Sequence, residues 1–113
     1  MHEMTIALNI VRIIEQAAQT QHFHSVSKVY VEVGPLSSVD IEALKFSFSA
    51  AVQSSHLAGT QLVLIELAGL ARCESCLEEV PIKHFYDACP CCGSYQLTVL
   101  QGDELRVKNL EVE

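Results

Sequence analysis

The stretch Cys73–Cys92, CESCLEEVPIKHFYDACPCC, is the part of the chain around which we expect the rest to be organised. It contains two Cys-x-x-Cys pairs, Cys73 with Cys76 and Cys89 with Cys92, and twelve residues lie between the pairs. Each pair can present two thiolates to one ion, and four thiolates complete the tetrahedral shell that a structural Zn²⁺ requires. The spacing therefore predicts a closed four-cysteine zinc site on a hairpin.

Other interpretations of these cysteines remain open. Iron could occupy the same four sulfurs, and a thiol redox enzyme would use one Cys-x-x-Cys pair without metal. Two disulfides would need an oxidising compartment, and we expect no secretory leader because Met1 leads into Glu3 without a basic segment or an apolar run. All five cysteines of the 113-residue chain lie in this stretch, which favours zinc. Cys91 is then the spare, oxidisable thiol, because pairing with Cys89 would give a tighter chelate.

The length of 113 residues indicates one small domain, with room for a satellite, and a hydrophobic content of 50% is enough for a modest core. No apolar run reaches the length of a transmembrane helix, so we expect a cytoplasmic protein without a membrane contact. The formal net charge is −7 before any metal is counted. Such a surface repels phosphate backbones, so we expect no nucleic acid as a partner.

Hydrophobic periodicity predicts five regular elements outside the cysteine stretch. Apolar residues recur at helical spacing in two segments and alternate, or run almost continuously, in three others. The first expected helix covers Thr5–Thr20, and the second ends at about Ser54, with Ser37 and Ser38 as the candidate caps at its start. The expected strands cover Val26–Gly34, Gln61–Leu67 and Glu104–Val112. The middle strand is apolar on both faces, which is typical of a central strand.

This order of elements predicts an α+β fold in which two helices pack on a small three-stranded mixed sheet, with an inserted four-cysteine zinc hairpin. We expect residues 1–70 and 98–113 to form the α+β domain and residues 71–97 to form the zinc-binding hairpin domain. The order of the strands does not follow from the sequence.

The first three residues, Met1-His2-Glu3, form a potential chelator. The terminal amine, the amide nitrogen of His2 and its imidazole can close five- and six-membered rings around one ion. A planar set of nitrogen ligands suits Ni²⁺ or Cu²⁺. On these residues alone, an accidental histidine at position 2 remains the simpler interpretation.

Four segments of the chain, taken together, form a more specific pattern that spans essentially its whole length. They are Met1-His2-Glu3; Gly34-Pro35-Leu36-Ser37-Ser38-Val39, followed by Asp40 and a helix with Leu44, Phe46 and Phe48; the four-cysteine hairpin with its Cys89-Pro90 turn; and Gly102-Asp103-Glu104-Leu105. In this combination and order they resemble the HypA/HybF family of hydrogenase nickel-insertion accessory proteins.

The resemblance implies a nickel metallochaperone rather than an enzyme. It implies that His2 is the principal nickel ligand, that Met1 contributes its amine and that Glu3 completes or adjusts the site, with Asp40 as an acid nearby. It also implies that residues 1–70 and 98–113 are the nickel-binding part and that the zinc ligands are Cys73, Cys76, Cys89 and Cys92. Cys91 departs from the family in the variable position of its Cys-Pro-x-Cys turn, which leaves open which adjacent thiol binds.

The partners implied by the resemblance are a hydrogenase-maturation GTPase similar to HypB and the large-subunit precursor of a [NiFe]-hydrogenase, with a homodimer as a further possibility. The alternative function is a zinc-ribbon module that binds nucleic acid or another protein. Acids outnumber bases between Arg72 and Gln96, which disfavours the nucleic-acid version. His56 and His84 are isolated in the sequence and do not suggest a catalytic site.

Overall fold

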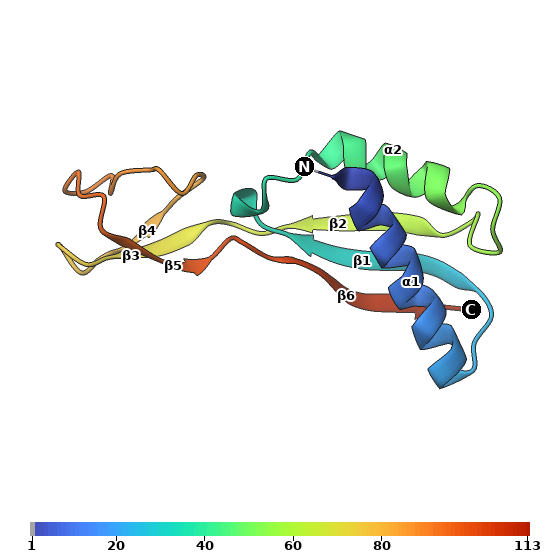
Figure 1. The fold of residues 1–113 in the computed structure, drawn as a ribbon. Helices are drawn as coiled ribbons and strands as arrows, with labels where there is room; N and C mark the ends of the chain where they lie inside the picture. Colours follow the sequence, from blue (N-terminus) through green and yellow to red (C-terminus); the bar gives the residue numbers. More distant parts are fainter. Residues whose placement is uncertain (1) are drawn as a thin grey trace. The chain divides into compact units, whose positions relative to one another are not determined.

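The computed structural model describes residues 2–113, so Met1 lies outside the described residues. The chain forms α1 (Glu3–Gln21), β1 (Val26–Val33), the 3-10 helix η1 (Pro35–Ser37), α2 (Ile41–Val52), β2 (Gln61–Glu66), β3 (Leu70–Cys73), β4 (Glu79–Pro81), β5 (Leu97–Gln101) and β6 (Leu105–Val112) (Figure 1). The expected α+β class and the five expected elements are confirmed. No helix within residues 2–113 has the length and apolar character needed to cross a membrane.

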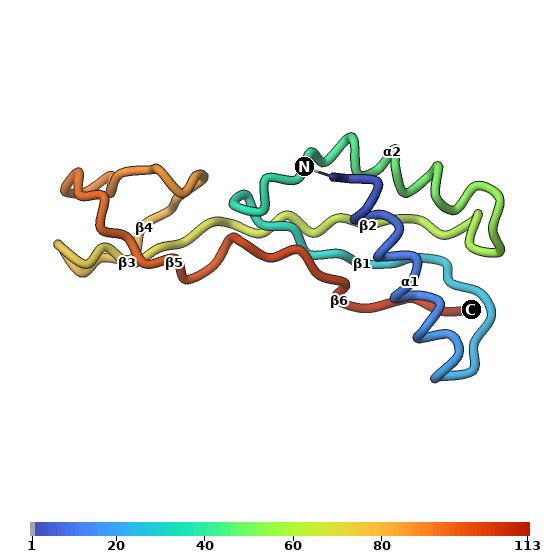
Figure 2. Tube along the Cα trace, viewed as in Figure 1, coloured from blue at the N-terminus to red at the C-terminus, as the bar shows by residue number. Residues whose placement is uncertain are grey.

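The chain divides into two compact units. Unit 1 contains the residues up to Val31, Val39–Leu64 and Arg106–Glu113; unit 2 contains Glu32–Ser38 and Ile65–Leu105. The chain passes from one unit to the other within β1, between η1 and α2, within β2 and within β6 (Figure 2).

The two helices pack against each other in unit 1 because each has an apolar stripe. α1 buries Ala7, Ile10 and Ile14, whereas α2 buries Leu44, Phe48 and Val52 at intervals of four residues. In β1, Val29 and Val31 are buried while Lys28 and Tyr30 are partly exposed, so the alternation expected from the sequence gives one covered face. Burial of these apolar side chains supplies the main stabilisation of the unit.

The strand order of the first sheet is β2-β1-β6. Thr60 Oγ1 donates to Val26 O (2.8 Å) where β1 and β2 begin, and Leu67 N donates to Val33 O (2.8 Å) where they end, so these two strands are parallel. The expectation that Gln61–Leu67 is a central strand is wrong. β2 lies at the edge of the sheet and its inner residues are only half-buried, so its continuous apolar run does not mark a strand that is covered on both faces.

β6 pairs with the other side of β1 in the opposite direction. Glu113 N donates to Ser25 O (3.1 Å), and Gly34 N donates to Glu104 O (2.9 Å), so the end of β6 meets the beginning of β1. The sheet is therefore mixed, as expected. A side chain at Gly34 would overlap the main-chain carbonyl of Gly102, which explains why the loop after β1 has a glycine where the two chains approach.

Unit 2 contains a second sheet that the sequence analysis did not predict. Its strand order is β4-β3-β5 and both pairings are antiparallel, with Ala71 opposite Val80 on one side and Val99 on the other. β4 has three residues and β5 has five, which is too short for a clear alternation of polar and apolar residues. These strands depend on pairing with β3 rather than on their own sequence pattern.

The cap of α2 also differs from expectation. Ser37 lies in η1, where its hydroxyl donates to Gly34 O (2.7 Å), and Ser38 adopts a left-handed conformation with φ of 61°. Pro35 begins the 3-10 turn and thereby moves the start of α2 to Ile41. The capping residue is instead Asp40, whose Oδ1 accepts a hydrogen bond from Ala43 N at 3.0 Å.

The cap gives a prediction about stability. Asp40→Ala should lower the free energy of unfolding by about 1 kcal/mol, because the N–H of Ala43 loses its acceptor. Asp40→Asn should leave it nearly unchanged, since asparagine caps a helix as well as aspartate does. Urea denaturation followed by circular dichroism measures both. Equal destabilisation by the two substitutions would show that capping is not the contribution of this carboxylate.

Candidate metal sites

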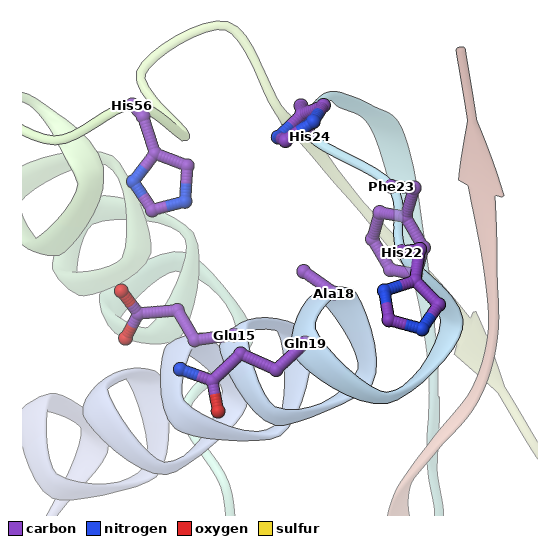
Figure 3. Close-up of a pocket in the computed structure, with 7 residues that line it drawn as sticks. All are labelled: Glu15, Ala18, Gln19, His22, Phe23, His24 and His56. Atoms are coloured by element: carbon purple, nitrogen blue, oxygen red, sulfur yellow. The ribbon is translucent and has the colours of Figure 1, made fainter.

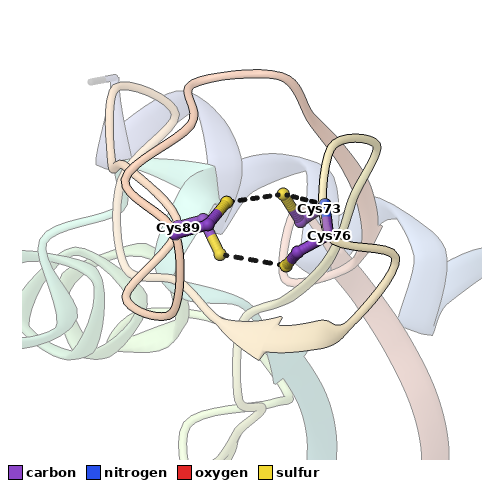
Figure 4. A group of neighbouring side chains, drawn as sticks. Cys73, Cys76 and Cys89 are labelled. Carbon is purple, nitrogen blue, oxygen red and sulfur yellow. Dashed lines mark hydrogen bonds between the residues drawn. The ribbon is translucent and has the colours of Figure 1, made fainter.

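The structure brings four cysteine sulfurs of unit 2 together. The Sγ atoms of Cys73, Cys76, Cys89 and Cys92 all lie within 4.8 Å of one another. Cys73 Sγ lies 3.5 Å from Cys92 Sγ, and Cys76 Sγ lies 3.8 Å from Cys89 Sγ (Figure 4). In a tetrahedral site with Zn–S bonds of about 2.3 Å, neighbouring sulfurs are about 3.8 Å apart. The arrangement therefore fits a tetrahedral metal ion of this size.

The first pair of cysteines lies on a tight turn after β3. Cys73 N donates to Glu78 O (2.9 Å), and Leu77 N donates back to Cys73 O (2.8 Å). Leu77 closes the turn in the left-handed region with φ of 64°, a conformation that costs a residue with a side chain about 1–2 kcal/mol. The turn points the sulfurs of Cys73 and Cys76 toward the same place.

The second pair repeats this geometry. Cys89 N donates to Ser94 O (2.7 Å), and Gly93 N donates back to Cys89 O (2.8 Å), so the residue offsets match those of the first turn. Gly93 stands where the first turn has Leu77 and has φ of 79°, which glycine adopts without strain. The repeated Cys-x-x-Cys spacing thus corresponds to a repeated backbone structure.

The protonation of the free thiols differs from one cysteine to the next. Cys76 N donates to Cys73 Sγ (3.5 Å), and this main-chain donor lowers the pKa of the Cys73 thiol to about 6 despite its burial. The main chain of Glu78 lowers the pKa of Cys76, but burial and the neighbouring sulfurs outweigh it and raise that pKa to about 12. Because metals bind thiolates, metal binding must displace the proton of Cys76 and weakens as the pH falls.

A small apolar cluster supports the buried cysteines from behind. It consists of Leu36, Ala71, Val80 and Ile82 together with Cys73 and Cys89. Leu36 comes from η1, far away in the sequence, and no local sequence signal connects it with the cysteines. Cys91 is exposed and lies outside the group of four sulfurs.

The nickel ligands expected from the resemblance lie at the start of α1. Met1 is outside the described residues. His2 is the N-cap residue: its carbonyl accepts a hydrogen bond from Ile6 N (3.1 Å), and its side chain is exposed. Glu3 Oε2 accepts a hydrogen bond from Asp40 N (3.1 Å), so the structure brings Glu3 next to Asp40 although 37 residues separate them. No local sequence signal indicates this contact.

These residues do not form a gathered metal site in the structure. Within residues 2–113, the four cysteines are the only group of three or more potential ligands whose donor atoms lie within 4.8 Å of one another. The carboxylate of Asp40 instead turns toward its own helix, where it caps α2. The first turn of α1 carries a partial positive charge that opposes a cation, and the Glu3 carboxylate in that turn offsets it.

Comparison of the sequence with known proteins agrees with the motifs. A family model described as "Hydrogenase/urease nickel incorporation, metallochaperone, hypA" matches residues 1–112. Two relatives are named Hydrogenase maturation factor HypA. The protein from Azotobacter chroococcum mcd 1 is 51% identical to this chain and the protein from Azotobacter vinelandii is 49% identical, each over 113 residues. Both alignments cover 100% of this chain and 100% of the relative.

Solved structures show the same fold. The solution structure of the Ni metallochaperone HypA from Helicobacter pylori aligns with 99% of this chain and 97% of its own, with a TM-score of 0.69 and 23% sequence identity. A second solution structure of a HypA protein covers 100% of this chain and gives a TM-score of 0.72. Because the family model and the relatives extend over the whole sequence, the chain belongs to the HypA family of hydrogenase and urease nickel-incorporation metallochaperones.

Proposed function

We propose that this protein binds Ni²⁺ at its N-terminus and delivers it to the large-subunit precursor of a [NiFe]-hydrogenase. The observation that carries the proposal is the position of His2, which has an exposed imidazole at the first turn of α1 and is followed by the anchored carboxylate of Glu3. An exposed site suits a carrier, because the ligands of the recipient can replace those of the donor one at a time.

The proposed ligands follow from the chemistry of the terminus. His2 supplies its imidazole and its amide nitrogen, and Met1 supplies the terminal amine, so that two chelate rings share the His2 nitrogen. Glu3 completes or adjusts the site. The hydrogen bond from Asp40 N to Glu3 Oε2 limits the positions of this carboxylate, and its other oxygen has no hydrogen bond to any of residues 2–113. Asp40 contributes its negative charge from outside the set of ligands.

We further propose that Cys73, Cys76, Cys89 and Cys92 hold a structural Zn²⁺. Sulfurs within 4.8 Å of one another match the size of a tetrahedral zinc site, and four protein ligands leave no position open for a substrate. When bound, the ion would supply folding free energy to the hairpin, in the range of about 10–16 kcal/mol known for small zinc peptides. Residues 71–97 would thus be the zinc-binding domain, and residues 1–70 with 98–113 the nickel-binding domain.

The partners in this proposal are a maturation GTPase similar to HypB, the hydrogenase precursor and a second copy of the chain. The names of the relatives support hydrogenase maturation as the setting. The protein acts as a carrier, not as an enzyme, and works in the cytoplasm, where a thiolate site remains reduced. A net charge of −7 suits metal cations and basic protein surfaces better than nucleic acid.

The zinc proposal is tested by single cysteine substitutions. Changing Cys73, Cys76, Cys89 or Cys92 to alanine should remove the zinc and disorder the turns of unit 2, because three thiolates cannot complete the shell. Cys91→Ala is the matched control and should keep one zinc per chain. Elemental analysis and amide hydrogen exchange measure the two effects. Retention of zinc by Cys92→Ala together with its loss from Cys91→Ala would reverse the assignment of these adjacent thiols.

The nickel proposal depends on where the chain begins as well as on its residues. Extending the chain by one residue before Met1 converts the amine into an amide, and His2→Ala removes the imidazole. Either change should weaken the tightest nickel-binding event, and His2→Ala should also abolish nickel-dependent hydrogenase maturation. Calorimetric nickel titration of the native, extended and His2→Ala proteins measures the binding, and each protein should retain one zinc and its circular dichroism spectrum.

Two outcomes of this titration would change the proposal. If His2→Ala binds nickel as tightly as the native protein, the N-terminal site does not exist. If the extended protein keeps its affinity while His2→Ala loses it, His2 is a ligand and the amine is not.

The contribution of Asp40 can be isolated because Asp40→Asn preserves the helix cap while it removes the charge. This substitution should lower nickel affinity by about tenfold, the smaller end of the effects that residues around a metal site have. The same calorimetric titration measures it. An unchanged titration curve would show that the Asp40 charge does not act on the nickel site.

A further inference from the structure

Unit 1 contains a cavity of about 380 Å³ at the end of α1, and three of the five histidines in the sequence line it (Figure 3). The histidines come from two segments far apart in the sequence, and acidic and apolar side chains complete the wall. The lining residues are Glu15, Ala18, Gln19, His22, Phe23, His24 and His56.

The backbone explains why these side chains meet. α1 ends at Gln21, and His22 follows in the left-handed conformation with φ of 60°, while its N–H donates to Ala18 O. This C-terminal turn reverses the chain before β1, so His22 and His24 both border the cavity. His56 reaches it from the loop that follows α2. In Figure 3 the His56 ring and the Glu15 carboxylate lie on one side of the opening, and the His22 and His24 rings lie on the other.

The side chains that could bind a metal ion in this cavity are accessible. The side chains of His22, His24, His56 and Glu15 are exposed, and within residues 2–113 none of them takes part in a hydrogen bond or an ion pair. Their neighbours in the wall include no lysine or arginine, so no cationic group of the lining opposes a positive ion. Imidazole nitrogen is the ligand that Zn²⁺, Ni²⁺ and Cu²⁺ share, and a carboxylate can complete such a site.

We propose that this cavity binds a divalent transition-metal ion through the imidazoles of His22, His24 and His56, with Glu15 as an additional ligand. The donor atoms are not gathered in advance, since the four cysteines are the only such group among the described residues. The exposed side chains must rotate to converge, so the site is weaker than the cysteine site and exchanges its ion more readily.

The site is distinct from the N-terminal one. α1 has 19 residues and is about 28 Å long, and His2 and His22 lie at its opposite ends. A single ion cannot contact both ends. The inference therefore does not depend on nickel binding by His2, and it can be tested in a protein that lacks that residue.

The experiment uses the full-length, zinc-loaded His2→Ala protein. Calorimetric titration with Ni²⁺ is carried out on this protein and on two derivatives of it. One derivative carries His22→Asn, His24→Gln and His56→Gln, in which asparagine preserves the left-handed turn at position 22. The other carries His84→Gln as a matched control, because His84 lies outside the cavity, stacked on Tyr86 and paired with Asp87. Circular dichroism verifies that all three are folded.

We expect His2→Ala to take up one Ni²⁺, the His84→Gln derivative to do the same, and the triple derivative to lose at least about tenfold in affinity, the scale of metal-site substitutions. In nitrogen-15 spectra of His2→Ala, nickel should broaden the imidazole signals of His22, His24 and His56 first. Absence of nickel uptake by His2→Ala, or equal uptake by the triple derivative, would overturn the proposal. Broadening of the His84 signal ahead of the other three would also overturn it.

Discussion

The convergence of four cysteine sulfurs within 4.8 Å is the constraint on which unit 2 depends. The apolar cluster behind the sulfurs contains few large side chains, and β4 has only three residues, so packing and sheet hydrogen bonds alone give this unit little stability. Leu77 adds strain because it closes its turn with a positive φ. A metal ion bound by all four thiolates would offset these disadvantages and hold both turns in the same geometry.

The cysteine site and the proposed N-terminal site differ in the property that decides whether an ion stays. The cysteine site is partly buried, is made of soft sulfur ligands and has no open position, which suits a permanent structural ion. The start of α1 offers the exposed imidazole of His2 and the half-buried carboxylate of Glu3, a mixed nitrogen and oxygen donor set at the surface. In the proposed function, one chain keeps zinc while it transfers nickel, because the donor chemistry and the exposure of the two sites suit opposite tasks.

The sequence was sufficient for the features that have a local pattern. Helical periodicity located α1 and α2, alternation located β1 and β6, and the doubled Cys-x-x-Cys spacing located the sulfur cluster. Structural features that depend on contacts between residues far apart in the chain could not be predicted from the sequence. The edge position of β2, the pairing of β4 and β5 with β3, and the bond from Asp40 N to Glu3 are set by tertiary packing. The capping by Asp40 instead of Ser37 followed from the 3-10 turn at Pro35.

The separation of the two metals by ligand type is tested most directly by X-ray absorption spectroscopy at the zinc and nickel edges. The sample is the untagged protein, loaded with one equivalent of nickel. The account predicts one zinc per chain surrounded by four sulfurs at about 2.3 Å, and nickel surrounded only by nitrogen and oxygen. Sulfur in the nickel shell, or nitrogen and oxygen replacing sulfur around zinc, would contradict it.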